Sequence, residues 1–171
     1  EPFSYYVNTR QVPQKLLILE NKDTFYSMRK SLLGDKKDIL GVEIGTLIYG
    51  AGKGIWRSFQ EFDSCAEPYM KDRNNELLYF GDLDYEGIFI YEKLAEIFAV
   101  RAEIKPFTIA YEQMLIKSSK LPLLPEMKEG QNQHISGQFF RFFSKETSDE
   151  MMKILETGRY IPQEILNIRD F

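Results

Sequence analysis

The sequence predicts an α/β fold, with a mostly parallel sheet of about four strands, helices on both faces and a helical C-terminal extension. Short apolar runs at residues 16–19, 46–49 and 77–80 are each bounded by turn residues and followed by a helical pattern. A fourth strand is expected over residues 103–110. Alternating strands and helices are typical of a parallel sheet whose crossover connections cover both of its faces.

Helices are expected directly after the first three strands. The first should cover residues 24–33, with Asp23 or Thr24 as its N-cap. The second is predicted over residues 55–65 and the third over residues 87–99, because apolar residues recur there at helical spacing.

The last third of the chain has a different pattern. Residues 118–138 carry prolines, glycines and many polar residues, which predicts a loop with at most one short helix. Four phenylalanines within residues 139–143 predict a helix buried against the sheet. Further helices are expected over residues 150–157 and, after a proline, over residues 163–168.

Length and composition indicate one compact unit. The chain has 171 residues, of which 43% are hydrophobic and 14% aromatic, enough for a core. We expect residues 1–13 to lead in from an upstream region, since the chain starts without methionine, residues 14–117 to form the core, and residues 118–171 to pack on it. The single cysteine, Cys65, excludes an internal disulfide and favours a cytoplasmic location. No apolar run is long enough to predict a membrane span.

Carboxylates follow two of the predicted strands at the point where each strand ends. Glu20 follows the first strand, and Asp82 and Asp84 follow the third. Because the carboxyl ends of parallel strands meet at one edge of a sheet, all three side chains should converge there. Clustered carboxylates without a basic partner repel one another unless a cation lies between them, and hard cations such as Mg²⁺ bind oxygen ligands together with water and phosphate. The pattern therefore predicts a divalent metal site and a phosphate-bearing substrate.

The same residues have simpler interpretations. A turn followed by a helix N-cap would explain Asp82 and Asp84 without a metal. Glu86 is either a further ligand or a first-turn carboxylate that complements the helix dipole. The only histidine, His134, lies in the polar loop, which disfavours a histidine-based catalytic triad.

A glycine-rich turn follows the second strand at residues 50–54. It fails the spacing of both the P-loop and the dinucleotide-binding motif, so we expect it to keep the exit of that strand clear. Lys53 in this turn, and Lys22 after the first strand, are weak candidates for a phosphate contact. A formal net charge of −4 argues against a broad basic face of the kind that holds a nucleic acid by itself, so metal ions and partner domains would have to help bind such a ligand.

Together these motifs resemble the Toprim domain of type IIA and type VI topoisomerases, primases and nucleases. The shared features are a strand followed by Glu20 and Asn-x-x-Thr-Phe, a Gly-rich turn, and Gly-Asp-x-Asp-x-x-Gly opening a helix at residues 81–87. Within that lineage, the segments Tyr-Phe-Gly-Asp-Leu-Asp at 79–84 and Tyr-Ile-Pro-Gln-Glu at 160–164 are similar to the C-terminal domain of the Wadjet plasmid-defence nuclease subunit. The resemblance spans roughly residues 14–168.

The resemblance implies a Rossmann-like Toprim fold and a metal-dependent DNA endonuclease that acts with an SMC-like complex. Asp82 and Asp84 would hold Mg²⁺ or Mn²⁺, and Glu20 would share a metal or act as general acid/base. Glu164 would be an accessory residue of the site. The relatives also imply a homodimer formed through regions outside this sequence.

Three other functions stay open at this point. A topoisomerase-like transesterase would need a tyrosine nucleophile, and ten tyrosines are available. A haloacid-dehalogenase phosphatase also begins with Asp-x-Asp, but Glu86 stands where that family has threonine or valine, and Glu20 would have no role. A noncatalytic interaction module would keep the fold without the metal.

Overall fold

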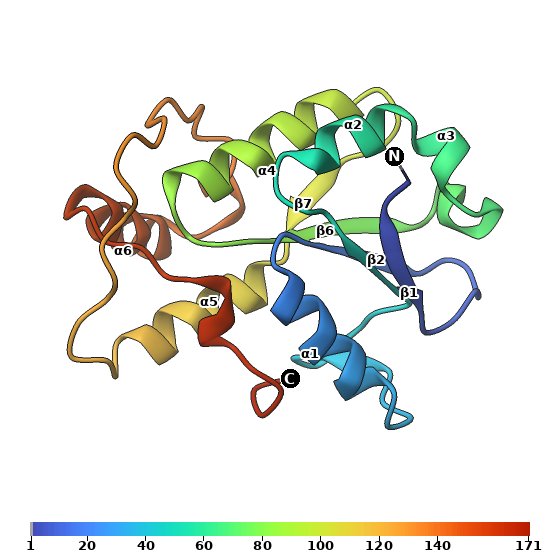
Figure 1. Ribbon diagram of the computed structural model, residues 1–171, viewed down its shortest axis with the longest axis horizontal. Coiled ribbons are helices and arrows are strands. Elements are labelled where there is room, and N and C mark those ends of the chain that lie inside the picture. The colour runs from blue at the N-terminus through green and yellow to red at the C-terminus, as the bar shows by residue number, and fades with distance from the viewer. Residues whose placement is uncertain (1) are drawn as a thin grey trace.

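A five-stranded sheet runs through the part of the chain that the computed structural model describes, residues 2–171, and helices cover both of its faces (Figure 1). The strands, in the order in which they lie side by side, are β1 (Ser4–Val7), β5 (Thr46–Tyr49), β2 (Lys15–Leu19), β6 (Glu76–Phe80) and β7 (Ile104–Pro106). Strands β5, β2, β6 and β7 are parallel, and β1 pairs antiparallel with β5. The predicted fold class is therefore confirmed.

Strand β1 is the main addition to the predicted sheet, because it lies within the segment expected to be a lead-in. Its residues pair with β5 from Ser4 opposite Tyr49 to Val7 opposite Thr46. Phe3, just before the strand, is buried and contacts Phe59 and Phe62 on the helices above. The start of the described chain is thus part of the core.

Two layers of helices enclose the sheet. In Figure 1, α2 and α4 lie on one face, and α1 and α5 lie on the other. The helices are α1 (Lys22–Leu32), α2 (Gly54–Gln60), α3 (Phe62–Cys65), α4 (Tyr85–Phe98), α5 (Thr108–Ser118) and α6 (Lys145–Glu156). Because β2 is covered on both faces, residues 16–19 are fully buried, which explains their continuous apolar run.

Several boundaries differ from the prediction. Strand β7 ends at Pro106 instead of residue 110, and α5 follows at Thr108. Helix α5 has its own signal, since Ala110, Tyr111, Met114 and Leu115 are buried at helical spacing. The predicted helix over residues 55–65 divides at Glu61 into α2 and α3.

The cap of α1 and the start of α6 also differ from the prediction. Helix α1 is capped by Asn21, whose side chain accepts a hydrogen bond from the amide of Thr24. Helix α6 starts five residues earlier than residue 150, because the Ser144 hydroxyl caps it by accepting from the amide of Thr147 at 3.1 Å.

The remaining elements are short. They are the hairpin β3 (Asp38–Ile39) and β4 (Val42–Glu43), and the 3₁₀ turns η1 (Pro68–Lys71), η2 (Phe140–Phe142) and η3 (Gln163–Ile165). The predicted buried helix over residues 139–143 is only the turn η2, beside which Phe139 is fully buried against Tyr111. No helix forms between α5 and η2. The last segment returns to the core, where Leu83 and Ile161 exchange two backbone hydrogen bonds of 2.8 and 3.2 Å.

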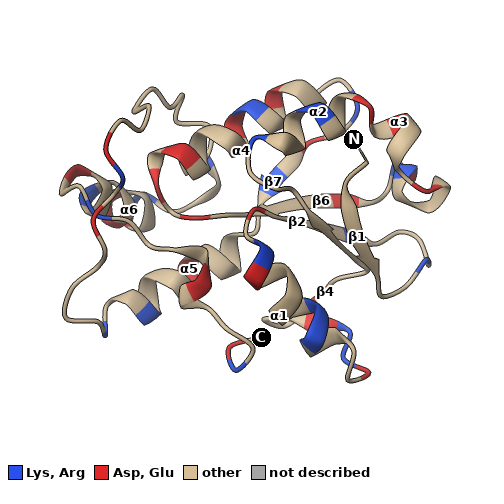
Figure 2. Ribbon diagram, in the orientation of Figure 1, with Lys and Arg blue, Asp and Glu red and all other residues tan. Residues whose placement is uncertain are grey.

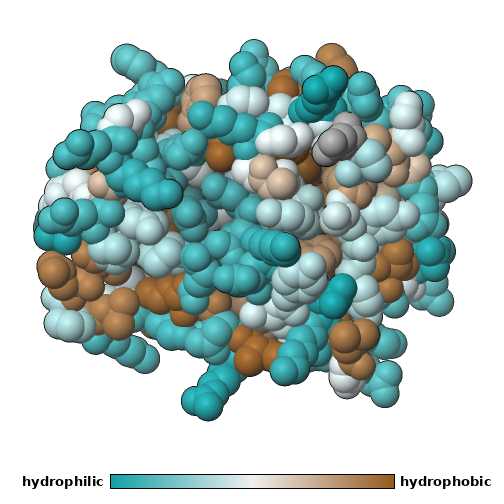
Figure 3. Space-filling view, viewed as in Figure 1, coloured by the Kyte–Doolittle hydropathy of each residue, from teal (hydrophilic) through white to brown (hydrophobic). Residues whose placement is uncertain are grey.

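The surface is largely hydrophilic on the face shown in Figure 3, with apolar residues gathered along its lower edge, over α5. Ile116 on α5 and Leu121 and Leu123 after it are exposed. Within residues 2–171, every helix is too short or too polar to cross a membrane.

Candidate metal centre

Glu20 and Asp82 meet because the strands before them are neighbours. Strands β2 and β6 are parallel and in register, with Leu19 opposite Phe80. The next residue on each strand therefore leaves the sheet at the same edge, and the amide of Glu20 still donates to the carbonyl of Phe80 at 3.1 Å. The Glu20 carboxylate turns toward the second loop, where its Oε2 accepts from the amide of Asp82 at 3.1 Å.

Two buried tyrosines hold this edge of the sheet in place through hydrogen bonds. The hydroxyl of Tyr79 lies 3.2 Å from Oε2 of Glu20 and donates to it, and the hydroxyl of Tyr111 accepts from the amide of Gly81 at 2.9 Å. Both tyrosines are almost completely buried. They fix the backbone and the carboxylate where β6 ends.

The two glycines of the acidic turn allow close approach. A Cβ atom on Gly81 would overlap Oε2 of Glu20 and crowd the Tyr79 hydroxyl. A Cβ on Gly87 would overlap the backbone carbonyl of Asp82. The spacing of glycines around the aspartates is therefore required by packing, and Gly81 in particular makes room for the carboxylate of another strand.

Asp84 is the N-cap of α4, as the simpler interpretation expected. Its Oδ1 accepts from the amide of Gly87 at 2.6 Å, and its Oδ2 accepts from Nε2 of Gln131 at 2.9 Å. The residue is only 6% exposed. Asp82, on the preceding turn, accepts at Oδ1 from the amide of Gln163 at 2.7 Å.

Gln163 joins the two loops, and the sequence analysis did not single it out. Its side chain is fully buried; Oε1 accepts from the amide of Asn21 at 2.8 Å, and Nε2 donates to the carbonyl of Phe80 at 2.8 Å. The neighbouring Glu164, predicted as an accessory residue, is exposed and acts on the site only through its charge, which raises the pKa of Asp82. The available signal was the similarity of residues 160–164 to the Wadjet subunit, which includes Gln163.

Burial raises the pKa of all three carboxyl groups, and neighbouring negative charges add to the effect. Burial raises the pKa of Glu20 to about 8, and the charges of Asp82 and Asp84 add to the effect. Burial also raises the pKa of Asp82 to about 6, although the Gln163 amide opposes it. The pKa of Asp84 is raised mainly by burial, against the hydrogen bonds from Gly87 and Gln131. The site therefore holds more negative charge than its surroundings stabilise.

The predicted basic residues do not neutralise this charge. Lys53 forms an ion pair of 3.3 Å with Glu86 at the surface, and Lys22 lies 5.9 Å from the ring centre of Tyr26 on α1. Within residues 2–171, Glu20, Asp82 and Asp84 form no ion pair. Figure 2 shows acidic residues along the connection from β6 to α4 and basic residues on α1.

Lys128 is the cation that sequence analysis missed. Its charge lowers the pKa of Asp82 and of Asp84, so it stands near both aspartates. It is exposed and lies in the polar loop between α5 and η2. Only the folding of that loop over the acidic turn reveals its position.

The donor set fits an open divalent-cation site and not a closed cage. In the described chain, no group of three or more acidic, histidine or cysteine side chains is arranged so that it could hold a metal ion by itself. However, the donors are all oxygens, and they form no ion pair within residues 2–171. Mg²⁺ is usually held by one or two carboxylates, with water and substrate phosphate completing the octahedron. Asp82 and Asp84 match that requirement.

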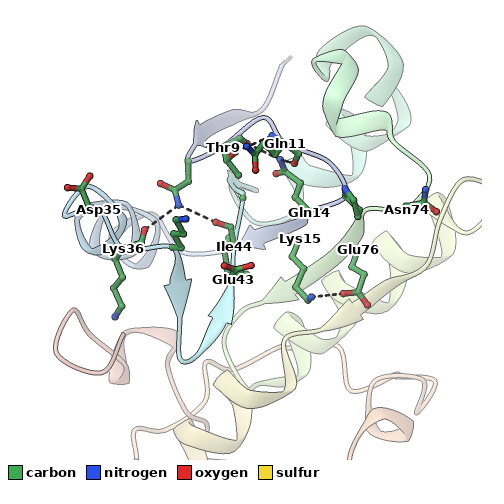
Figure 4. Close-up of a pocket in the computed structure, with 14 residues that line it drawn as sticks. Thr9, Gln11, Gln14, Lys15, Asp35, Lys36, Glu43, Ile44, Asn74 and Glu76 are labelled. Carbon is green, nitrogen blue, oxygen red and sulfur yellow. Dashed lines mark hydrogen bonds and ion pairs between the residues drawn. The ribbon is translucent and has the colours of Figure 1, made fainter.

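A separate polar pocket of about 560 Å³ lies at the opposite end of the strands. Its lining includes Lys15 and Glu76, the first residues of β2 and β6. Figure 4 shows these two side chains pointing toward each other, and their charged atoms are 3.0 Å apart. This pair is neutralised, unlike the carboxylates at the carboxyl ends of the strands.

Comparison with protein families gives one match that covers more than half of the chain. The family described as Wadjet protein JetD, C-terminal, matches residues 2–120. No curated protein matches the chain. The matched segment includes all five strands of the main sheet and the three carboxylates Glu20, Asp82 and Asp84. Gln131 and Gln163 lie beyond it.

Proposed function

The chain belongs to the family of C-terminal domains of the Wadjet protein JetD, and on that premise we propose that it is the DNA-cutting module of a plasmid-defence complex. The reaction would be divalent-metal-dependent hydrolysis of a phosphodiester, on a fold of the Toprim type. One observation carries the proposal: Glu20, Asp82 and Asp84 share the carboxyl edge of the sheet with raised pKa values and no ion-pair partner within residues 2–171.

Asp82 and Asp84 would hold Mg²⁺ or Mn²⁺. A bound divalent ion supplies an activated water and neutralises charge on the phosphoryl oxygens. Asp82 is held in place by the amide of Gln163, and Asp84 by the first turn of α4, so both carboxylates are oriented before any ligand arrives. Glu86 faces Lys53 at the surface, which favours its role as a first-turn carboxylate over that of a ligand.

Glu20 would act as the general acid/base. In the metal-free protein, burial raises the pKa of Glu20 to about 8, so this carboxyl group takes up a proton more readily than an exposed glutamate does, which suits a general acid/base. In hydrolysis a water oxygen bonds to phosphorus, the bond to the leaving oxygen breaks, and a proton is delivered to that oxygen. The geometry suits Glu20 to hold this proton, because its Oε2 is fixed by Asp82 and Tyr79.

The tyrosines next to the site favour hydrolysis over topoisomerase-like transesterification. Burial raises the pKa of Tyr79 and Tyr111 far above the usual value, and both hydroxyls are engaged in hydrogen bonds. Tyr160 is less buried. Its pKa is raised mainly by burial, and the negative charges of Asp82 and Glu164 add to the effect. Tyr79 and Tyr111 are each only 1% exposed, so neither hydroxyl can reach a phosphate of the substrate.

A noncatalytic interaction module is the second candidate. It is favoured by Asp84, both of whose oxygens are already hydrogen-bonded to Gly87 and Gln131. In either case, the proposed partners are DNA and the SMC-like subunits of the complex, in the cytoplasm. The net charge of −4 means that DNA would be delivered largely by those partners and by the metal.

A plasmid-nicking assay separates the two candidates. Supercoiled plasmid would be incubated with the wild type, Asp82→Asn, and Glu20→Gln in Mn²⁺ or Mg²⁺, with Glu86→Gln as the control carboxylate. Asparagine keeps the hydrogen bond from Gln163, so Asp82→Asn tests charge and not folding. Nicking by the wild type and Glu86→Gln alone supports the nuclease. If all four proteins leave the plasmid intact, including when the Wadjet complex is added, the interaction module is correct.

A further inference from the structure

The loop between α5 and η2 crosses the acidic turn as a strap, residues 126–139, that is fastened at both ends. At one end, the amide of Met127 donates to the carbonyl of Gly158 at 2.8 Å. At the other end, the Glu92 carboxylate on α4 accepts from the amides of Ser136 at 2.6 Å and Phe139 at 3.0 Å. In Figure 1 this segment passes the end of α4 at which Asp84 lies. The middle of the strap is therefore held over the carboxylates.

Gln131 is the residue by which the strap touches the site. Its Nε2 donates to Oδ2 of Asp84 at 2.9 Å. Its Oε1 is buried and finds no hydrogen-bond donor within residues 2–171. A buried carbonyl oxygen without a partner bears the full cost of losing water, so the amide of Gln131 has an oxygen free to accept a further interaction.

The orientation of the amide is set by the carboxylate. An ionised carboxylate can only accept hydrogen bonds, so the NH₂ group of Gln131 must face Asp84. A cation bound at Asp84 would reverse this preference, because it attracts the oxygen of the amide and repels the NH₂ group. Rotation about the last bond of the side chain exchanges the two groups without moving the strap.

We propose that Gln131 is a ligand of the divalent cation held by Asp82 and Asp84, and that it contributes its amide oxygen from the strap. This inference rests on the proposed metal site. Amide carbonyls are suitable ligands for Mg²⁺ and Mn²⁺, together with carboxylates and water. Glutamine suits the position because, unlike lysine or arginine, it holds Asp84 in place without neutralising the charge that attracts the cation.

Cation binding would then fasten the strap to the site. Before binding, one hydrogen bond joins Gln131 to Asp84. With a cation bound, Gln131 from the strap and Asp84 from the acidic turn would both help to hold it. Lys128, on the same strap, would remain near both aspartates.

Calorimetric titration of Mn²⁺ into the 171-residue chain tests the ligand role. The variants are Gln131→Met, which keeps the length of the side chain without its polar atoms, and Gln131→Glu, which restores an oxygen. Gln133→Met, at an exposed position two residues along the strap, is the matched control. We expect Gln131→Met to weaken Mn²⁺ binding by about tenfold or more, and Gln133→Met to leave it unchanged. Gln131→Glu should bind Mn²⁺ at least as tightly as the wild type.

Melting temperatures in EDTA show whether Gln131 is a metal ligand or only stabilises the folded protein. A structural role alone would lower the melting temperature of Gln131→Met in EDTA while its Kd for Mn²⁺ stayed at the wild-type value, and that result would overturn the ligand role but leave the proposed function intact. Absence of Mn²⁺ binding by the wild type at millimolar concentration would overturn the metal site itself, and the ligand role with it.

A nuclear magnetic resonance experiment with Mg²⁺ reports on the amide directly. The side-chain NH₂ signals missing from the spectrum of Gln131→Met identify Gln131 in the wild type. These signals should shift on saturation with Mg²⁺, because the NH₂ group leaves Asp84. Signals that stay in place while Mg²⁺ binds would contradict the rotation.

Discussion

The backbone amide of Gln163 donates a hydrogen bond of 2.7 Å to Oδ1 of Asp82, a residue 81 positions earlier in the chain. The same glutamine uses its side chain to join Asn21 to Phe80, at the ends of β2 and β6. One residue of the C-terminal segment thus holds together both loops that carry the carboxylates. The extension is part of the site.

Replacing Gln163 by alanine should lower the free energy of unfolding by about 2–4 kcal/mol, because the Asn21 amide would lose its acceptor and a fully buried side chain that also donates to the Phe80 carbonyl would be removed. Urea unfolding followed by circular dichroism measures the change. Glu164→Ala is the neighbouring control and should stay within about 0.5 kcal/mol of the wild type. Equal effects of the two substitutions would show that Gln163 does not connect the loops.

Gly81→Ala should displace the Glu20 carboxylate, because the new methyl group would occupy the space of Oε2. We expect a loss of about 1–3 kcal/mol in stability, as for other overpacked sites, together with loss of nicking activity. Gly34→Ala is a suitable control, since its Cβ would lie 3.8 Å from the nearest atom, the carbonyl oxygen of Ser31. Wild-type nicking activity in Gly81→Ala would show that activity does not require the contact between the Glu20 carboxylate and the Asp82 amide.

The stability of the metal-free protein should fall as pH rises. The pKa of Glu20 is about 8 in the folded protein, against an ordinary value of 4.5, so the folded state holds this proton more tightly than the unfolded state does. Its stabilising contribution is full below about pH 4.5, declines from there, and is gone above about pH 8. The pKa of Asp82 acts in the same direction but only up to about pH 6.

Unfolding in EDTA between pH 6.5 and 8 isolates the effect of Glu20. The decline can reach about 1.4 kcal/mol per pH unit, the value of one proton difference between the two states. Glu20→Gln should remove most of this slope, because glutamine does not titrate. A wild-type stability that is level over the range would show that Glu20 is already ionised in the folded protein.

The sequence predicted the structure correctly where the pattern of a single strand or helix is enough to identify that element. The strands at residues 46–49 and 77–80 are recognisable because central parallel strands are buried on both faces and read as continuous apolar runs. The carboxylates after the strands could be placed together because parallel strands share an edge. Helix α5 was missed although its spacing is helical, since the apolar residues just before it read as one long strand.

The residues that complete the site could not be predicted because their roles depend on long-range packing. Gln131 lies 47 residues from Asp84, and Gln163 lies 142 residues from Asn21. A glutamine in a polar segment is ordinarily exposed, and nothing local distinguishes these two from Gln133. Only the path of residues 119–138 over the acidic turn reveals Gln131, and only the return of the C-terminal segment to the ends of β2 and β6 reveals Gln163.

The central claim is that the acidic edge of the sheet is a divalent-cation site. Calorimetric titration of Mn²⁺ into the wild type and into the double variant Asp82→Asn, Asp84→Asn tests it most directly, because asparagine is as good an N-cap as aspartate and preserves α4. Binding by the wild type that is lost in a double variant with an unchanged circular dichroism spectrum is the predicted result. Equal binding by both proteins, or by neither at millimolar Mn²⁺, would contradict it.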